Sequence, residues 1–321
     1  MRKILVGLGQ MGALTFAGLT APEVVADRPV DSPVGPGKTC ITASCHEDLA
    51  SKTFVHAVAE DGTSCDICHT AVEEARHGFA LNSEEGLLCA ECHDVAERGE
   101  SRHSPAEEGM CTACHDPHQS DYRRLLLASR ASELCLQCHD DASFKRGFIH
   151  QPVADGDCSA CHDPHAAADS RLLRGSYPSS AYARFEETRY LCFDCHIEEA
   201  FSEPRTLTET AFRNGNLNLH FRHVNRIKGR SCRNCHDPHS ADRPALIRKQ
   251  VPFGSASIAI EDFERTETGG RCQPTCHVTA VYDRLVPAFT AIKVTPRLGE
   301  EAEADEVLKA PGEKKGDQDG D

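Results

Sequence analysis

Hydrophobic positions along most of this chain recur with the period of neither a helix nor a strand, which predicts few long regular elements. Two apolar stretches stand out. The first, "ILVGLGQMGALTFAGLT", follows Arg2 and Lys3, and the second, "VPFGSASIAIEDF" within residues 240–271, is the best strand candidate and predicts a β-hairpin or an edge arm. Residues 278–321 form an acidic extension without aromatic residues from about residue 295, where the composition predicts disorder.

The N-terminal apolar stretch has the layout of an export signal. Two basic residues precede it, and "VVA" ending at Ala26 supplies the small residue at which signal peptidases cleave. We therefore expect loss of residues 1–26, a Pro-rich leader at residues 27–39 and a soluble periplasmic protein. The alternatives are an uncleaved anchor, which the short apolar region interrupted by Gln10 disfavours, and an outer-membrane-associated or extracellular location.

The composition does not provide for a hydrophobic core of ordinary size. Only 39% of the 321 residues are hydrophobic, Trp is absent, and the mean hydropathy is -0.45. In contrast, the chain contains 18 Cys and 18 His, both far above ordinary usage. A group bound to these side chains is therefore expected to fill the interior.

The cysteines form nine pairs, and a His follows the second Cys of every pair. Seven pairs are CXXCH, and two are stretched to CX4CH and CX3CH. The CXXCH sites are Cys65, Cys68 and His69; Cys89, Cys92 and His93; Cys111, Cys114 and His115; Cys135, Cys138 and His139; Cys158, Cys161 and His162; Cys192, Cys195 and His196; and Cys232, Cys235 and His236. The stretched sites are Cys40, Cys45 and His46, and Cys272, Cys276 and His277.

The Cys–His dipeptide distinguishes between the possible uses of these thiols. Disulfides and zinc sites give no reason for a His directly after the second Cys, because zinc ligands come as separated pairs. A c-type haem does: two thiols about one helical turn apart form thioethers to one porphyrin, and the next imidazole reaches the iron. The sequence therefore predicts covalently bound haem. The number of haems is nine if the two stretched sites also attach one each.

These motifs resemble those of multihaem c-type cytochromes with doubled CXXCH motifs of the "CxxCHDPH … LCxxCH" kind. The resemblance covers about residues 40–277. It implies an extended electron-carrying fold, mostly α and irregular with little β, in which haems form the core. We expect a nonahaem domain over residues 40–277, built of two-haem repeats at about 53–100, 101–147, 148–200 and 218–280.

The remaining histidines match the irons in number and are the candidate distal ligands. The only methionine after the expected cleavage site is Met110, which stands beside Cys111, so we expect bis-histidine ligation throughout. The nine candidates are His56, His77, His103, His118, His150, His165, His220, His223 and His239. Their positions recur: His56, His103, His150 and His223 lie eight or nine residues before a CXXCH motif, and His118, His165 and His239 lie three residues after one. His77 comes later in the first repeat, and His220 is a spare ligand.

The "CHDPH" string predicts where the second His goes. Pro disfavours an α conformation at the preceding Asp and ends the helical turn, so the second His should bind a neighbouring iron. The working assignment puts His118 on the His139 haem and His165 on the His196 haem, while His103 and His150 fold back over the haems of their own motifs. The Asp residues after the proximal His, Asp94, Asp116, Asp140, Asp163 and Asp237, are either partners of the ligands or solvated loop carboxylates.

Three classes of function compete. An electron conduit needs six-coordinate haems in series and no catalytic residue. A multihaem reductase of a small nitrogen or sulfur compound needs an open iron, which the number of histidines disfavours. A disulfide- or zinc-stabilised scaffold is disfavoured by the nine Cys–His dipeptides. We expect the conduit, an electron carrier rather than an enzyme.

The expected partners are redox proteins. "FRNGNLNLHFRHVNRIKGRSCRNCHDPH" followed by "TGGRCQPTCH" resembles the C-terminal part of periplasmic cytochromes that pair with an outer-membrane porin and an outer-surface cytochrome. This resemblance implies extracellular electron transfer, in a direction that the sequence leaves open, as it does the oligomeric state. The net charge of -15 favours partners with basic faces and disfavours nucleic acid.

Overall fold

The computed structural model describes residues 40–41, 46–72, 78–94, 99–178, 180–183, 185, 189–225 and 228–288. The expected export signal, the leader and the tail from about residue 295 lie outside these residues, as do Cys45 and His77. Within the described part, no helix has the length and apolar character needed to cross a membrane.

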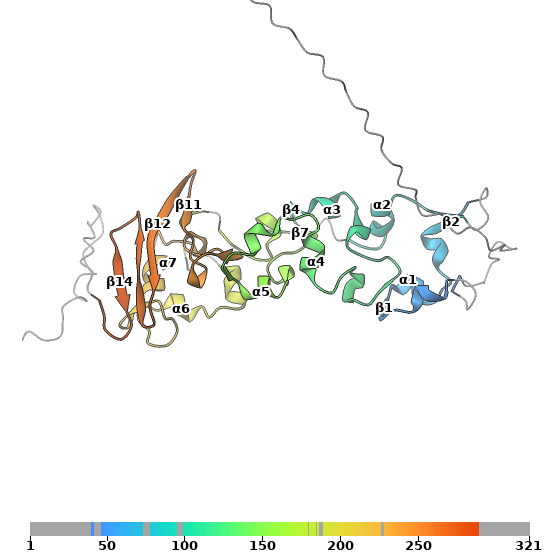
Figure 1. Ribbon diagram of the computed structural model, residues 1–321. Helices are drawn as coiled ribbons and strands as arrows, with labels where there is room; N and C mark the ends of the chain where they lie inside the picture. The colour runs from blue at the N-terminus through green and yellow to red at the C-terminus, as the bar shows by residue number, and fades with distance from the viewer. Residues whose placement is uncertain are drawn as a thin grey trace, which may run out of the picture.

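Short helical turns alternate with short strands along an elongated rod (Figure 1). The chain runs from the turns near α1 at one end to a four-stranded sheet at the other. The helices of the described residues are α1 (Ala57–Glu60), α2 (Glu85–Ala90), α3 (Ser104–Glu107), α4 (Ala131–Cys135), α5 (Gln151–Ala154), α6 (Glu199–Ser202) and α7 (Leu219–Val224).

Strands are as prominent as helices, so the expectation of a mostly α fold with little β is wrong: helical turns make up 29% of the structure and strands 25%. The strands are β1 (Phe54–Val55), β2 (His69–Ala71), β3 (Phe79–Leu81), β4 (Ser101–Arg102), β5 (Gln119–Ser120), β6 (Phe148–Ile149), β7 (Ala166–Ala167), β8 (Arg213–Asn214), β9 (Leu217–Asn218), β10 (Ser240–Ala241), β11 (Gln250–Phe253), β12 (Ala256–Arg265), β13 (Gly269–Pro274) and β14 (Ala280–Asp283). Most have two or three residues, too few for an alternating pattern to appear in the sequence.

Three of these short strand pairs join one repeat to the next. β1 pairs with β5, β4 with β7, and β6 with β10, all antiparallel. In each pair the first strand stands just before an upstream His and the second just after a "CHDPH" motif one repeat later. Every repeat is therefore hydrogen-bonded to its successor in the same way.

Helices α1, α3 and α5 start directly after His56, His103 and His150 and stop after one turn. A glycine in the left-handed conformation follows each of them two residues after the helix ends. At Gly109, with φ 75°, a Cβ would also lie 2.6 Å from the Cα of Gly86. Only glycine allows both this backbone conformation and this close contact between the first and second repeats.

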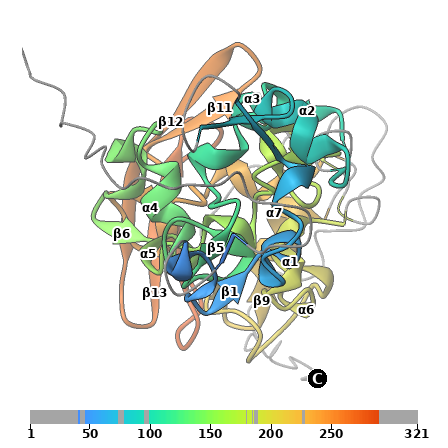
Figure 2. The ribbon, with the colours of Figure 1, turned by 90° about the vertical axis from the view of Figure 1, so that its right-hand side faces the viewer.

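The C-terminal sheet has the order β11-β12-β13-β14. Its first two strands form the hairpin that "VPFGSASIAIEDF" predicts, turning at Gly254 with φ 59°. In Figure 2, viewed from the N-terminal end of the rod, this hairpin projects beyond the helical turns. β13 carries Cys272, and β14 continues the sheet past His277 to Asp283.

Little apolar protein surface is buried. A single hydrophobic cluster of the described residues, built on Phe185, Tyr190 and Val224, lies beside Cys192 and Cys232. Elsewhere along the rod the turns surround histidine and cysteine side chains rather than leucines and valines. The expectation that bound groups fill the interior agrees with this shortage of core residues.

Candidate haem-binding sites

Each CXXC segment of the repeats forms a tight helical turn that places its two thiols one turn apart. In the second, third and fourth repeats the first motif is a 3-10 turn, at Cys111–Ala113, Cys158–Ala160 and Cys232–Asn234. The N–H of the following His donates to the carbonyl oxygen of the first Cys over 3.0 Å in all three. The turn therefore sets the imidazole in one fixed relation to both thiols, as thioether attachment and proximal ligation of one haem require.

Among the described residues, seven pairs of imidazole rings face one another at nearly the same separation, 5.9 to 6.5 Å between ring centroids. A metal–imidazole nitrogen bond is about 2 Å long, so two rings on opposite sides of one metal ion have centroids roughly 6 Å apart. Each pair joins one proximal and one candidate distal His, and this spacing fits an iron between them. The pairs are His56 with His93, His69 with His118, His103 with His139, His115 with His165, His150 with His196, His162 with His239, and His220 with His236.

The pairing of distal with proximal histidines follows a regular pattern, which differs from the working assignment based on the sequence. An upstream His faces the second proximal His of its own repeat, as His103 faces His139 and not His115. A "CHDPH" His faces the first proximal His of the preceding repeat, so His118 lies opposite His69 and His165 opposite His115. The "CHDPH" His thus reaches a neighbouring site, as its Pro predicts, but a site that precedes it in the chain.

The upstream histidines are oriented by the "CHDPH" prolines of the next repeat. The Nδ1 atoms of His56, His103 and His150 lie 2.9, 2.8 and 3.0 Å from the carbonyl oxygens of Pro117, Pro164 and Pro238. A carbonyl can only accept, so each Nδ1 carries the proton and donates it. This fixes the tautomer in which Nε2 has its lone pair available for a metal.

A second set of carbonyls orients the first proximal His of three repeats. The Nδ1 atoms of His115, His162 and His236 donate to the carbonyl oxygens nine residues later, over 2.8, 2.9 and 2.8 Å. The accepting residues are Arg124, Arg171 and Ala245, with φ of 60, 62 and 55°.

The backbone at these acceptors is strained, because a left-handed non-glycine residue costs roughly 1–2 kcal/mol. The following residue is left-handed as well, and its carbonyl accepts the N–H of the Asp after the proximal His. Strain repeated at the same place in three repeats indicates a function, here the orientation of a ligand. The sequence analysis missed these residues, although the strings "RRLLL", "SRLLR" and "PALIR" at a constant offset are a visible signal.

Three of the Asp residues hold the turn that carries the second His. An Oδ1 atom of Asp116, Asp163 and Asp237 accepts the backbone N–H of the His two residues later, over 2.9, 3.0 and 3.2 Å. They act on the distal ligand through the backbone. Asp140 instead accepts the N–H of Ala142 at the start of a 3-10 turn.

Burial keeps several candidate ligands neutral. It lowers the pKa of His118, His165, His236 and His239, and it lowers the pKa of His220 to about 3. A neutral imidazole is the form that binds iron, so these side chains are ready as ligands at neutral pH. Burial also raises the pKa of the Cys235 thiol to about 11, which disfavours a thiolate there.

Helix α7 ends the series of pairs. No later repeat provides a "CHDPH" His for His236, and His220 on α7 takes that place, with its Nδ1 3.0 Å from the Thr210 hydroxyl. The fully buried Asn218 caps α7 by accepting the Phe221 N–H, and its amide donates to the carbonyl oxygens of two residues at α6. The spare histidine of the sequence is thus held firmly opposite a proximal one.

Replacing His220 with Ala should therefore create one high-spin haem, because the iron at His236 would lose its sixth ligand. Electron paramagnetic resonance of the oxidised protein measures this directly. Thr210→Val is the matched control, since it removes only the hydroxyl and should leave the spectrum low-spin. An unchanged spectrum in the His220→Ala variant would mean that His220 is a structural residue.

Two of the predicted iron ligands, His277 and His223, are not among the seven imidazole pairs. His277 is half-buried, its Nδ1 donates to the Val278 carbonyl oxygen over 2.6 Å, and within the described part no second imidazole faces it. His223, one turn after His220 on α7, stacks on Phe212. The first stretched site cannot be placed, because Cys45 and the candidate ligand His77 lie outside the described residues.

The attachment sites follow one another closely along the rod. The first Cys of the second motif in one repeat lies within hydrogen-bonding reach of the first Cys of the next repeat, in the pairs Cys89 and Cys111, Cys135 and Cys158, and Cys192 and Cys232. The described cysteines form no disulfide, and the described residues contain no cluster of three or more side chains suited to a metal ion. The sites thus form one continuous row in sequence order.

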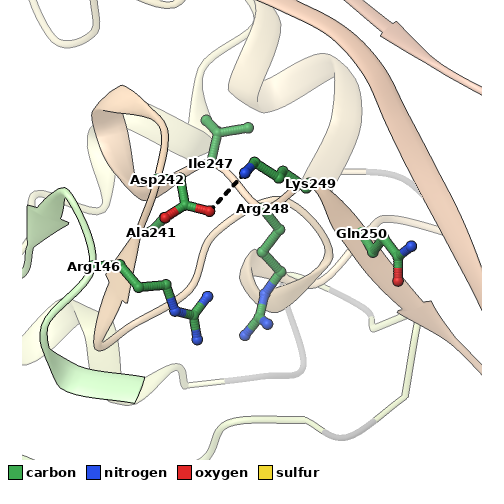
Figure 3. Close-up of a pocket in the computed structure, with 7 residues that line it drawn as sticks. All are labelled: Arg146, Ala241, Asp242, Ile247, Arg248, Lys249 and Gln250. Carbon is green, nitrogen blue, oxygen red and sulfur yellow. Dashed lines mark ion pairs between the residues drawn. The ribbon is translucent and has the colours of Figure 1, made fainter. Parts of the chain in front are cut away.

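A polar cavity of about 330 Å³ lies where the second and fourth repeats meet (Figure 3). Arg146 and Arg248 both contact the buried Asp237 carboxylate at 3.3 Å, and Lys249 pairs with Asp242 at 2.8 Å. Arg248 also donates to the His236 carbonyl oxygen. Guanidinium groups beside a ligand are suited to the carboxylates that haem carries as propionates.

Comparison with known families agrees with these motifs. The family model described as "Doubled CXXCH motif" matches residues 103–144, 150–201 and 225–253, which covers the second and third repeats and part of the fourth. No curated protein matches the chain. The match supports a multihaem c-type cytochrome with covalently bound haem c, and with it a role in electron transfer.

Proposed function

We propose that this protein is an electron conduit in which haems lie in a row and electrons pass between neighbours along the rod. The observation that carries the proposal is the series of seven imidazole pairs, each with the separation that one iron requires. The contacts between cysteines of successive repeats support a row without a gap.

Haem iron supplies one-electron chemistry by changing between the ferric and ferrous states. The chain's residues would hold each group by two thioethers and by imidazole rings on both sides. In six of the seven imidazole pairs, one ring is fixed by a hydrogen bond from its Nδ1 to a backbone carbonyl. Two histidine ligands lack the potential-raising effect of a Met ligand, so we expect mostly negative potentials that overlap along the row. Overlapping potentials allow electrons to pass in either direction.

A second candidate function is a reductase of a small nitrogen or sulfur compound at the last site. His277, with no imidazole opposite it in the described part, favours this alternative. Carbon monoxide binding to one haem of the reduced protein, together with turnover of nitrite or hydroxylamine, would support the reductase. Poor carbon monoxide binding and no turnover support the conduit alone.

The cellular setting is a further part of the proposal. The N-terminal export signal supports a periplasmic protein, and the resemblance at residues 212–239 and 268–277 supports extracellular electron transfer with an outer-membrane porin and an outer-surface cytochrome. Co-purification of the tagged protein with a porin tests this. Recovery of a free protein would favour a periplasmic shuttle.

The number of haems is the most direct prediction. The intact mass of the mature protein should correspond to nine covalently attached haems and to the loss of residues 1–26. Nine are expected because every Cys belongs to a pair followed by His. The Cys272→Ala/Cys276→Ala variant should lose the mass of one haem; a wild-type mass with seven haems would mean that the stretched sites are not attachment sites.

A further inference from the structure

The exposed charges of the rod are unevenly distributed. In residues 46–72, 78–94 and 99–100, at the N-terminal end in Figure 1, nine exposed carboxylates stand against one exposed basic residue, Lys52. Within the described residues none of the nine forms an ion pair with Lys or Arg. They are Glu47, Asp48, Glu60, Asp61, Asp66, Glu84, Glu91, Asp94 and Glu100.

Some of these carboxylates lie at the attachment turns themselves. Asp66 stands between Cys65 and Cys68, Glu91 stands between Cys89 and Cys92, and Asp94 directly follows His93. In the second and third repeats, the only charged residue between the paired cysteines is Asp194. Three of the nine carboxylates therefore lie where the haems of the first repeat would be attached.

Apolar side chains are exposed among these charges. Leu87 is 64% exposed, Leu81 51% and Ile67 48%, the last within the first CXXCH motif. Exposed apolar side chains together with polar and charged ones are found in protein–protein docking surfaces. Here nearly all of the exposed charged side chains are negative.

A segment nearer the other end has the opposite balance. Residues 228–250 contain Lys228, Arg230, Arg233, Arg243, Arg248 and Lys249, of which Lys228 and Lys249 are exposed, but only two acidic residues, Asp237 and Asp242. The charge therefore varies along the rod, and the net charge of the whole chain does not describe it. A basic partner would be attracted more strongly to the N-terminal end than to this segment.

We propose that the N-terminal end of the rod, around His69 and His93, is the docking surface of a redox protein whose own face is ringed by lysine and arginine side chains. This inference rests on the proposed conduit function and adds to it the end at which such a partner exchanges electrons. Docking there brings the partner's cofactor close to the first two CXXCH haems of the row.

The test uses the complete haem-loaded protein and a lysine-rich mitochondrial-type cytochrome c as the probe. Stopped-flow absorbance measures the bimolecular rate of electron transfer from the reduced protein to the oxidised probe. The Asp66→Asn/Glu91→Gln/Asp94→Asn variant should be slower by about fivefold or more at low ionic strength. Its rate should also depend less on salt, because fewer charges remain to be screened.

The matched control is Asp194→Asn/Glu198→Gln/Glu199→Gln, which removes three exposed carboxylates at the equivalent turn beside His196. This control variant has the same net charge as the N-terminal variant, and its rate of electron transfer should stay within about twofold of wild type. Equal losses in the two variants would reduce the effect to net charge and overturn the docking surface. An unchanged rate in the N-terminal variant would overturn it as well.

A separate measurement keeps the two proposals apart. Limiting amounts of a small reductant should reduce the haems of wild type and of both variants to the same extent, because these substitutions leave every thioether and imidazole in place. If the haems do not exchange electrons with one another, the conduit proposal is overturned. The rate of electron transfer to the probe can still depend on the N-terminal charges in that case. If the haems exchange electrons but the two variants react alike, only the docking surface fails.

Discussion

Replacing His118 with Ala should convert one haem from low-spin to high-spin, and that haem should be the one attached at Cys65 and Cys68. His118 lies 6.0 Å from His69, between ring centroids, and belongs to the next repeat. Its loss leaves the iron at His69 with five ligands, while the haem of its own motif keeps His115 and His165. Electron paramagnetic resonance should show one high-spin iron per protein, and the reduced variant should bind carbon monoxide at one haem.

Removing individual attachment sites identifies the affected haem. In a Cys65→Ala/Cys68→Ala background, the His118→Ala substitution should add no high-spin signal, because its target haem is absent. In a Cys135→Ala/Cys138→Ala background, the signal should persist. The reverse result would restore the assignment of His118 to the haem at His139 and contradict the pairing described here.

Chain made without haem attachment should be largely unstructured, which is the largest expected effect on stability. The buried hydrophobic residues of the described part are few, and none of its α-helices exceeds six residues. Isolated helices shorter than about 12 residues are marginal in water, so packing around porphyrin rings must stabilise the turns. Far-UV circular dichroism should lose most of its helical signal, and urea should produce no cooperative transition.

The haem-loaded protein is the control for this measurement and should unfold cooperatively. A native-like spectrum of the haem-free chain would show that the protein alone specifies the fold. The sheet formed by β11, β12, β13 and β14 is the segment best able to keep some structure, since it has the longest strands and the buried Val251 and Ile260.

The proximal side of each site could be predicted from the sequence, because a CXXCH motif is local and its turn needs only neighbouring residues. The set of distal candidates followed from counting, and seven of the eight that the structure describes lie opposite a proximal His. Their pairing did not follow, because strands such as β1 and β5 bring together residues more than 60 positions apart. Strand pairs of two residues carry no pattern by which such a contact could be recognised.

The supporting hydrogen bonds were also beyond the sequence analysis. Pro117 was interpreted only as a residue that ends a helical turn, yet its carbonyl orients His56. Arg124 adopts a left-handed backbone conformation that is unusual for an arginine, and nothing in the amino-acid sequence indicates this conformation. At the C-terminal end, Cys272 lies on β13, where the expected helical turns are replaced by a sheet and no imidazole of the described residues faces His277.

The exchange of histidines between successive repeats sets a rule for how such a chain can change in length during evolution. The second, third and fourth repeats each give their "CHDPH" His to the preceding repeat, and α7 supplies His220 to the fourth. An in-frame duplication of one whole repeat inside the array therefore leaves each of these imidazole pairs complete. A truncation that removes α7 leaves the last complete repeat one ligand short, so the array can grow in its interior but needs the same terminal segment at every length.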